Sequence, residues 1–331
     1  MRKWKERLLG NKNRFYFGIL ILILLMLIVW SSYSALNVGK QEEVCRISVI
    51  VNDSNSDRWT ALREGLEQAA ENNQVELNVV ATGNMTTVEE ERKLALRELD
   101  NGAKGIILQP ISSTKSAELV QEISQRAAVM LLENEIEAPE NYAIAEPDNT
   151  AIGKAVAQAV TEDFSGDLSG KRIGILCGDV GQYAMKQRLE GFLSVIGESE
   201  AVIAWTFGGE VEDIGSRLAG SSSVDIMVAL GNDELEQAVD YAEQNAGNKK
   251  KCLIYGEGCS QKNVYYLDKG CIRFLAVPNE FNMGYCSVAE MAEQLKFRVP
   301  QMERVTIDFL SINRENLYEE ENQRILFPIV Q

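Results

Sequence analysis

Short runs of apolar residues alternate along most of the chain with stretches that are apolar on one side only. The runs are rich in Val, Ile and Leu, as in strands that are buried on both faces of a parallel sheet. The stretches between them have the period of amphipathic helices. In the first half, the predicted strands are 46–51, 75–81, 105–108, 128–132 and 142–145, with helices at 57–72, 87–101, 113–127 and 149–163.

The second half repeats this order. Matching strands in the two halves begin about 125 residues apart. Because strand–helix–strand units form right-handed crossovers, we expect an α/β fold of two Rossmann-like, doubly wound parallel-sheet lobes. The second set of predicted strands is 171–177, 201–206, 224–230, 252–256 and 271–277, with helices at 181–197, 210–219, 232–246 and 283–296.

A long apolar segment precedes the first predicted strand. No charged residue occurs from Phe15 to Gly39, and six basic residues come before Phe15. About 20 apolar residues span a bilayer, and basic residues stay on the cytoplasmic side. The pattern predicts a cytoplasmic segment at 1–14, a transmembrane anchor at 15–34 and a tether at 35–45 that leads to an extracytoplasmic body. A cleaved signal segment is the alternative, although its apolar stretch would be long.

The body of the chain is acidic. The whole sequence has 33 Lys and Arg against 49 Asp and Glu, and the basic N-terminal segment holds several of the cations. Such a body repels phosphate backbones, which argues against nucleic-acid binding. His is absent and the six Cys include no CxxC pair. We therefore expect no metal site, no cofactor and no His-based catalysis.

Polar and aromatic residues follow the predicted strands, where ligands bind in parallel sheets. Facing clusters from two lobes predict a small-molecule cleft between them. Carboxylates and amides suit the hydroxyls of a sugar, and an indole ring suits its apolar face. The clusters are NDSNSDRW after 46–51, Gln109–Pro110, Glu133–Asn134, EPDN at 146–149, GDVGQYAMKQR after 171–177, Gly231–Asn232–Asp233, GEG at 256–258 and PNEF at 278–281.

Several motifs together resemble the type I periplasmic solute-binding proteins, in particular their ribose- and sugar-binding branch. The resemblance covers about residues 46–310 and rests on NSDRWTALREGLEQAA, NGAKGIILQP, AEPDNTAIGKAVA, KQRLEGF, GNDELEQA and YGEG, in that order. It implies two lobes joined by a hinge of three crossovers, near Asp148, Pro278 and Pro300. The implied lobes are 46–147 plus 279–300 and 148–278 plus 301–331.

The resemblance also implies ligand-binding positions. The stacking aromatics of the family fall on Arg58 and Trp59, of which only Trp59 is aromatic. An acid and an amide, Glu133 and Asn134, take the place of an Asp–Arg pair. The family's arginine falls on Lys186. The candidate ligand-binding residues are Arg58, Trp59, Glu133, Asn134, Asp148, Gln182, Lys186, Asn232 and Glu257.

Structural roles stay open for several candidates. Helix packing is the alternative for Trp59, and a helix N-cap role is the alternative for Asp148 and Asn232. The choice between Lys186 and Arg188 is unresolved, with a structural role for Arg188 as the alternative. About half of the family's polar positions are altered, so the resemblance favours a monosaccharide or related polyol without naming it.

The function implied by the resemblance is capture of a sugar-like solute outside the cell for delivery to an ABC permease. The alternative is a membrane-tethered sugar sensor that signals to a receptor or sensor kinase. A transcription-repressor core shares the fold, but the apolar N-terminal segment and the acidic body argue against it. We expect no enzyme: Gly174, Gly178 and Gly181 lack the GxGxxG spacing, and nothing marks Asp53 and Asp57 as a catalytic pair.

Cys252 and Cys271 begin two successive predicted strands. The resemblance implies that these strands are adjacent and parallel, which puts a disulfide within reach in an oxidising compartment. A register slip of one residue would point the side chains to opposite faces. Free thiols are therefore the simpler interpretation.

Overall fold

The computed structural model describes residues 16–32, 45–52, 59–80, 82–83, 85–209, 214–245, 252–297 and 302–327. The chain divides into two compact units, Met1–Val44 and Cys45–Gln331.

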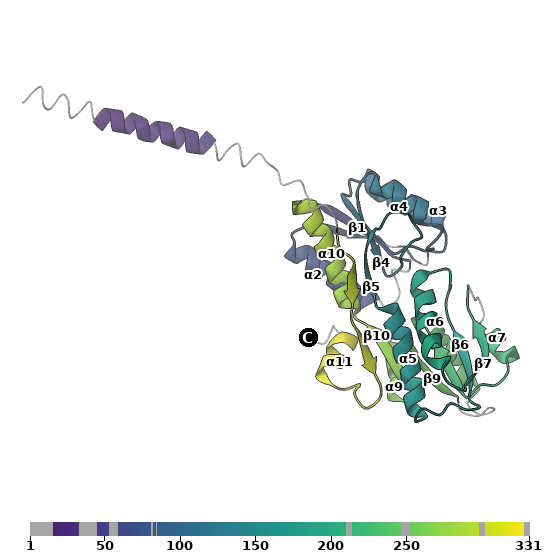
Figure 1. The fold of residues 1–331 in the computed structure, drawn as a ribbon. Helices are drawn as coiled ribbons and strands as arrows, with labels where there is room; N and C mark the ends of the chain where they lie inside the picture. Colours follow the sequence, from purple (N-terminus) through teal and green to yellow (C-terminus); the bar gives the residue numbers. More distant parts are fainter. Residues whose placement is uncertain are drawn as a thin grey trace, which may run out of the picture. The chain divides into compact units, whose positions relative to one another are not determined.

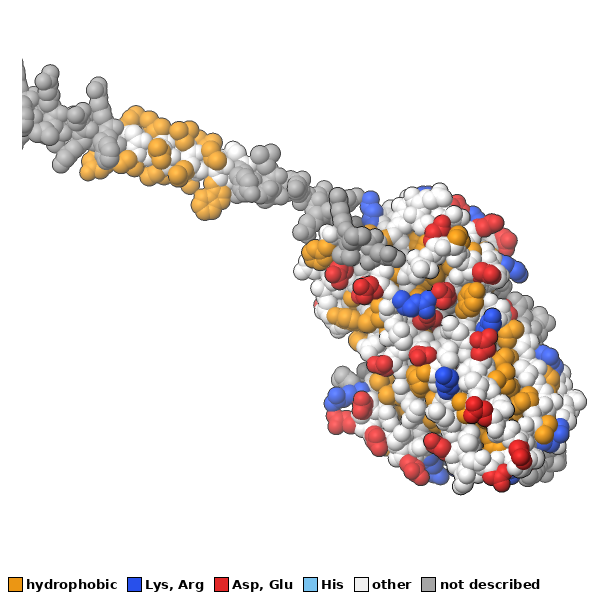
Figure 2. Space-filling view, viewed as in Figure 1, with side chains coloured by type: hydrophobic (Ala, Val, Ile, Leu, Met, Phe, Trp, Pro, Cys, Tyr) orange, Lys and Arg blue, Asp and Glu red, His pale blue; other side chains and the backbone are white. Residues whose placement is uncertain are grey.

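In the first unit, residues 16–32 form a helix with exposed side chains, coloured orange in Figure 2. Within the described ranges, no helix combines the length and the apolar character needed to cross a membrane. The anchor predicted at 15–34 begins and ends outside the described residues and stays a prediction.

The first lobe of the second unit is built on a parallel sheet of order β11-β5-β4-β3-β1-β2. Two helices, α2 (Trp59–Asn72) and α10 (Glu280–Phe297), share one core cluster with this sheet. The helices α3 (Val88–Asp100) and α4 (Ala117–Ser124) share another cluster with its opposite face (Figure 1). The strands are β1 (Arg46–Ile50), β2 (Glu76–Val79), β3 (Gly105–Leu108), β4 (Ala128–Leu132), β5 (Ala143–Pro147) and β11 (Val305–Ile307).

The second lobe has a sheet of order β12-β10-β9-β8-β6-β7. Its strands are β6 (Arg172–Leu176), β7 (Val202–Phe207), β8 (Ile226–Ala229), β9 (Leu253–Glu257), β10 (Ile272–Pro278) and β12 (Phe309–Ile312). One face packs on α5 (Asn149–Asp163) and α6 (Tyr183–Ile196). The other packs on α7 (Ile214–Gly220), α8 (Asn232–Gln244), α9 (Gln261–Asp268) and α11 (Glu320–Leu326).

The prediction of an α/β fold with two doubly wound lobes is confirmed, with one correction to the second sheet. Its edge strand β12 pairs antiparallel with β10, so the sheet is mixed rather than purely parallel. All four clusters of core residues lie between Ile47 and Leu326. The unit that begins at Cys45 therefore contains its own core.

The chain passes between the two sheets three times. It enters the second lobe after β5 and returns to the first after β10. The third crossover predicted near Pro300 is wrong, because β11 pairs with β5, Val305 opposite Ala145. The chain crosses between Ile307 and Phe309 instead. A strand of three residues is too short to leave a pattern in the sequence.

Glycines allow one pair of helices in each lobe to touch through the main chain. A Cβ atom added at Gly65 of α2 or Gly284 of α10 would lie 2.0 or 2.2 Å from a carbonyl oxygen of the other helix. In the second lobe, a Cβ at Gly153 of α5 would lie 2.0 Å from the carbonyl oxygen of Arg188 on α6, and one at Gly191 would meet α5 at 2.2 Å. This close contact fixes the main chain of Arg188 against α5.

All six cysteines are free thiols. Ile272 of β10 pairs with Ile254 of β9. The same register places Cys271 opposite Leu253, one position away from Cys252. The structure thus favours free thiols over the disulfide between Cys252 and Cys271.

Candidate functional site

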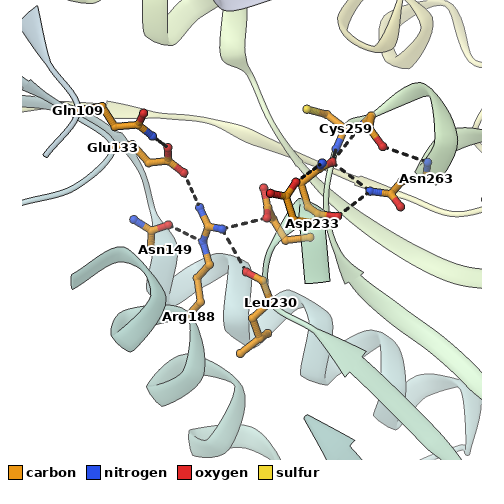
Figure 3. Close-up of polar contacts among 11 residues, drawn as sticks. Gln109, Glu133, Asn149, Arg188, Leu230, Asp233, Cys259 and Asn263 are labelled. Atoms are coloured by element: carbon orange, nitrogen blue, oxygen red, sulfur yellow. Dashed lines mark hydrogen bonds and ion pairs between the residues drawn. The ribbon is translucent and has the colours of Figure 1, made fainter. Parts of the chain in front are cut away.

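Arg188 is the centre of a polar cluster between the two lobes (Figure 3). It lies on α6, and only 4% of it is exposed. Its Nε donates to Asn149 Oδ1 at 2.8 Å, and its Nη1 donates to the carbonyl oxygen of Leu230 at 3.1 Å. Nη1 also donates to Glu257 Oε2 at 2.9 Å, and Nη2 to Glu133 Oε1 at 3.3 Å. One guanidinium thus pairs with a carboxylate from each lobe.

Glu133 extends the cluster into the first lobe. It follows β4 directly and has a φ of 62°, a left-handed conformation that costs a non-glycine residue energy. Its Oε2 accepts a hydrogen bond from Gln109 Nε2 at 2.7 Å, and Gln109 Oε1 accepts one from the main-chain nitrogen of Asn52 at 2.9 Å. The carboxyl ends of β4, β3 and β1 are therefore linked at one edge of the sheet.

Three buried polar atoms at or beside this cluster have no hydrogen-bond partner among the described residues: Asn134 Oδ1, Glu146 Oε2 and Asn149 Nδ2. Asn134 adjoins Glu133, and Asn149 is bonded to Arg188 through its oxygen. Buried polar atoms are nearly always paired, because desolvation without a partner is costly. These atoms are suited to contact a ligand that both donates and accepts hydrogen bonds.

The charges beside the cluster are mostly negative. Burial raises the pKa of Glu146 to about 7, against the lowering effect of Arg304, and the neighbouring carboxylates Glu135, Asp148 and Glu133 raise it further. Arg304 Nη1 lies 2.6 Å from Glu146 Oε1, and its Nη2 lies 2.6 Å from Glu135 Oε1. Arg304 precedes β11, so this ion pair lies close to the first and third crossovers.

A second set of contacts joins the lobes. Gln182, the N-cap residue of α6, donates from Nε2 to the carbonyl oxygen of Ile111 at 3.1 Å. The main-chain nitrogen of Tyr183 donates to Ser113 Oγ at 3.0 Å. Ile111 and Ser113 belong to the loop after β3, which the buried Glu91 of α3 holds through the nitrogen of Ile111 at 3.0 Å. We call these two hydrogen bonds between lobes the interlobe latch.

The structure brings three of the nine candidate residues to the cluster. Glu133 and Glu257 pair with Arg188, and Asn134 is buried directly after Glu133. Gln182 lies between the lobes as part of the interlobe latch. Arg58 lies outside the described residues.

The other candidates have different surroundings. Lys186 is exposed and lies 4.0 Å from Glu190 of its own helix, so Arg188 rather than Lys186 supplies the cation of the cluster. Asp148 is an exposed N-cap whose Oδ1 accepts from the nitrogen of Ala151 at 2.8 Å. The structure therefore places Arg188 in the position expected for Lys186, and it gives Asp148 the N-cap role that was its alternative.

Asn232 and Trp59 have structural roles. Asn232 Oδ1 accepts from the main-chain nitrogens of Cys259 and Ser260 at 3.2 and 3.1 Å and from Asn263 Nδ2 at 3.0 Å, which holds the loop after β9. Trp59 is 5% exposed in the core cluster of the first lobe, where it shares a small cavity with Leu62. Contact of Trp59 with a ligand stays a prediction.

Four residues at or beside the cluster were not among the candidates: Gln109, Glu146, Asn149 and Arg188. All of them lie in segments that the sequence marks as strand ends or as the helix after 171–177. Among the described residues, no group of three or more Cys, Asp or Glu side chains is arranged to hold a metal ion. The cluster offers carboxylates, amides and one guanidinium, which can bind hydroxyl groups from several directions.

Residues 47–298 match the model of a family described as periplasmic binding protein domain. No curated protein matches the chain. Similar solved structures include a carbohydrate transporter solute-binding protein from Agrobacterium radiobacter in complex with D-arabinose. It is 16% identical with a TM-score of 0.77, over 86% of this chain and 99% of that one.

Two further structures are similar at the same level. The myo-inositol-binding protein of Caulobacter, bound to myo-inositol, is 17% identical with a TM-score of 0.73, over 85% of this chain and 97% of that one. The XylFII–LytSN complex contains a chain that is 17% identical with a TM-score of 0.71, over 82% of this chain and 98% of that one. At these identities the likeness shows the fold.

Proposed function

The chain belongs to the periplasmic binding protein domain family, and from this we propose that it captures a sugar-like solute between its two lobes. The family consists of binding proteins, so the chain is not an enzyme. The proposed ligand is a monosaccharide or a related polyol, and the proposed site is the cluster around Arg188.

The observation that carries the proposal is the combination of paired and unpartnered polar atoms in and beside that cluster. Asn134 Oδ1 and Glu146 Oε2 can accept hydrogen bonds, and Asn149 Nδ2 can donate one. A hydroxyl group donates and accepts at once, so a polyol satisfies both kinds of atom. The arabinose and inositol complexes of similar structures support the same class of ligand.

The contacts between lobes suggest how the solute is retained. Arg188 pairs with Glu257 of its own lobe and Glu133 of the other, and the interlobe latch adds two hydrogen bonds. The pair with Glu133 and the two hydrogen bonds of the interlobe latch exist only when the lobes lie together. We infer that a ligand bound to both lobes stabilises this closed arrangement, because it is bound more tightly there than by either lobe alone.

We further propose that the unit from Cys45 onward works outside the cell, held by an N-terminal membrane anchor at 15–34. The support is the uncharged apolar stretch with basic residues on one side of it. In this arrangement the loaded protein delivers its solute to an ABC permease in the same membrane.

A membrane-tethered sugar sensor is the second candidate. The observation that favours it is the similar structure of XylFII in a complex with LytSN, since a protein of this fold there docks on another protein. In this case the closed form would contact a receptor or sensor kinase rather than a permease. The cleft and its ligand are the same in both proposals.

A solute screen tests the shared part of the proposal. Residues 41–331, which contain the compact unit with its own core, are screened by thermal unfolding against pentoses, hexoses, inositols and, as a control class, amino acids. A ligand at 100 times its Kd stabilises the folded state by about 2.7 kcal/mol. We expect a polyol to raise the Tm and Glu257→Gln to abolish that rise. Stabilisation by amino acids alone would contradict the proposal.

A deletion separates the two candidates. If the protein serves an importer, cells without it lose uptake of the radiolabelled sugar that the screen identifies. If it serves a sensor, uptake through a constitutively expressed permease persists, while induction of sugar-responsive genes is lost.

A further inference from the structure

A cavity of about 390 Å³ lies in the second lobe, away from the cluster around Arg188. Its walls come from the amino ends of β8, β9 and β10 and from the carboxyl ends of α7 and α8. The strand β9 shows the separation: Ile254 near its start lines the cavity, and Glu257 at its end pairs with Arg188. The volume is in the range of small-molecule sites.

The deep wall of this cavity is apolar. Leu218, Met227, Val239 and Ile254 line it, and each is 2% exposed or less. The indole of Trp205 forms a further part of the wall. The cavity opens to solvent, so an apolar occupant that covers this wall removes apolar surface from water. An apolar cavity of this size therefore favours an occupant.

Several polar groups around the cavity have hydrogen-bond partners within the protein. Trp205 Nε1 donates to the carbonyl oxygen of Ser222 at 3.1 Å, and the hydroxyl of Tyr241 donates to the carbonyl oxygen of Leu218 at 3.1 Å. Arg172 Nη2 donates to Ser222 Oγ at 2.8 Å. Against the apolar wall, a sugar would lose hydration without gaining hydrogen bonds. The cavity thus suits a different class of ligand from the cluster around Arg188.

Two thiols complete the wall, those of Cys252 and Cys271. Burial raises the pKa of Cys252 to about 12, and Asp225 adds to the rise. A thiol that stays protonated at neutral pH is a poor nucleophile and acts as a small apolar group. Cys252 therefore adds to the apolar surface.

We propose that this cavity is a second binding site, which takes an uncharged, mainly apolar molecule. The buried aliphatic wall selects against a charged ligand, and the indole of Trp205, which stacks on Phe207 with ring centroids 4.6 Å apart, adds to the apolar surface. The site is on the edge of the second sheet opposite the solute cleft, so both ligands bind at the same time.

The test uses N-phenyl-1-naphthylamine, an uncharged aromatic dye that becomes fluorescent in apolar sites. Residues 41–331 contain only two tryptophans, Trp59 in the core of the first lobe and Trp205 in the cavity wall. We expect saturable dye binding with energy transfer from tryptophan. Trp205→Phe should remove most of this transfer, and Trp59→Phe should leave most of it.

A second variant fills the cavity. Ala242 lines it near the end of α8, whereas Gln244 on the same turn is exposed and does not. Ala242→Phe should weaken dye binding by about tenfold or more, and the matched control Gln244→Phe should leave it unchanged. Circular dichroism checks that both variants are folded. If Ala242→Phe does not fold, the comparison of Trp205→Phe with Trp59→Phe decides.

Three results would overturn the proposal. They are no saturable dye binding, energy transfer that survives Trp205→Phe, and wild-type affinity in a folded Ala242→Phe variant. Competition between the dye and a polyol from the solute screen would instead place the dye in the cleft, which also contradicts a separate site.

Discussion

Replacing Arg188 with methionine removes the cation that joins the two lobes while keeping most of the aliphatic side chain. Glu133 and Glu257, both buried, lose the guanidinium that neutralises them at 3.3 and 2.9 Å. Removal of one partner of a buried ion pair costs about 3–5 kcal/mol, because a buried charge is left without compensation. The hydrogen bonds to Asn149 and Leu230 are lost with it.

This loss of folding stability should be measurable without any ligand. In domains of 150–250 residues, a change of 1 kcal/mol shifts the Tm by about 2–4 °C. We therefore expect Arg188→Met to lower the Tm of residues 41–331 by roughly 6–20 °C in thermal unfolding followed by circular dichroism. If the lobes unfold separately, the transition of the second lobe should shift most, since Arg188 packs against α5.

Two further variants isolate the cause. Lys186→Met removes a cation from the same helix, but Lys186 is exposed and 4.0 Å from its partner, and such surface pairs contribute about 0–1 kcal/mol. Its Tm should stay close to that of the wild type. Adding Glu257→Gln to Arg188→Met neutralises one stranded carboxylate and should restore part of the Tm. Equal, small shifts for Arg188→Met and Lys186→Met would refute the reasoning.

Three other predictions follow from the structure. Burial raises the pKa of Glu146 from its ordinary 4.5 to about 7, so the folded state binds the proton more tightly than the unfolded state. The stability gained from that proton is complete below about pH 4.5 and is lost as the pH rises through 7. The Tm of Glu146→Gln should therefore rise relative to wild type between pH 5 and pH 8, and a constant difference would contradict this. Trp59→Ala should cost about 3–5 kcal/mol of unfolding free energy in urea titrations, because it empties part of the core, and a loss below about 1 kcal/mol would place Trp59 outside it. Ser113→Ala removes the acceptor of Tyr183 in the interlobe latch and should weaken every ligand by the same factor of about 2–10 in calorimetry, whereas a change for one ligand only would mean a direct ligand contact.

The sequence pattern located most strands because their residues are buried on both faces. The runs at 105–108 and 128–132 coincide with β3 and β4 as observed. The pattern could not locate β11, which has three residues and lies at the edge of its sheet. The antiparallel direction of β12 likewise depends on where the chain crosses, which local composition does not encode.

The site was predicted at the right strand ends but partly at the wrong residues. Lys186 and Arg188 are two positions apart on α6, so they point in very different directions. The buried positions of this helix include Ala184, Arg188 and Phe192, at intervals of four. Lys186 falls outside that stripe. A reading of helical periodicity, with no reference to a family motif, would have selected Arg188.

The two residues at the start of α5 show a different limit of prediction from sequence. Asp148 and Asn149 are neighbours of residue types that both favour the N-cap, and the structure uses the first as an N-cap and the second as a partner of Arg188. Either assignment fits the sequence. The decision depends on which side chain faces the other lobe, and that is set by the direction of the crossover.

The position of α10 has a consequence for the order in which the protein is made. This helix supplies Met283, Val288, Met291 and Ala292 to the core of the first lobe, yet it emerges from the ribosome about 130 residues after β5. The second lobe, by contrast, is almost continuous in sequence and completes its parallel strands first. During synthesis the apolar face of α2 therefore remains uncovered until α10 arrives, and in that interval the nascent first lobe is a natural client for chaperones.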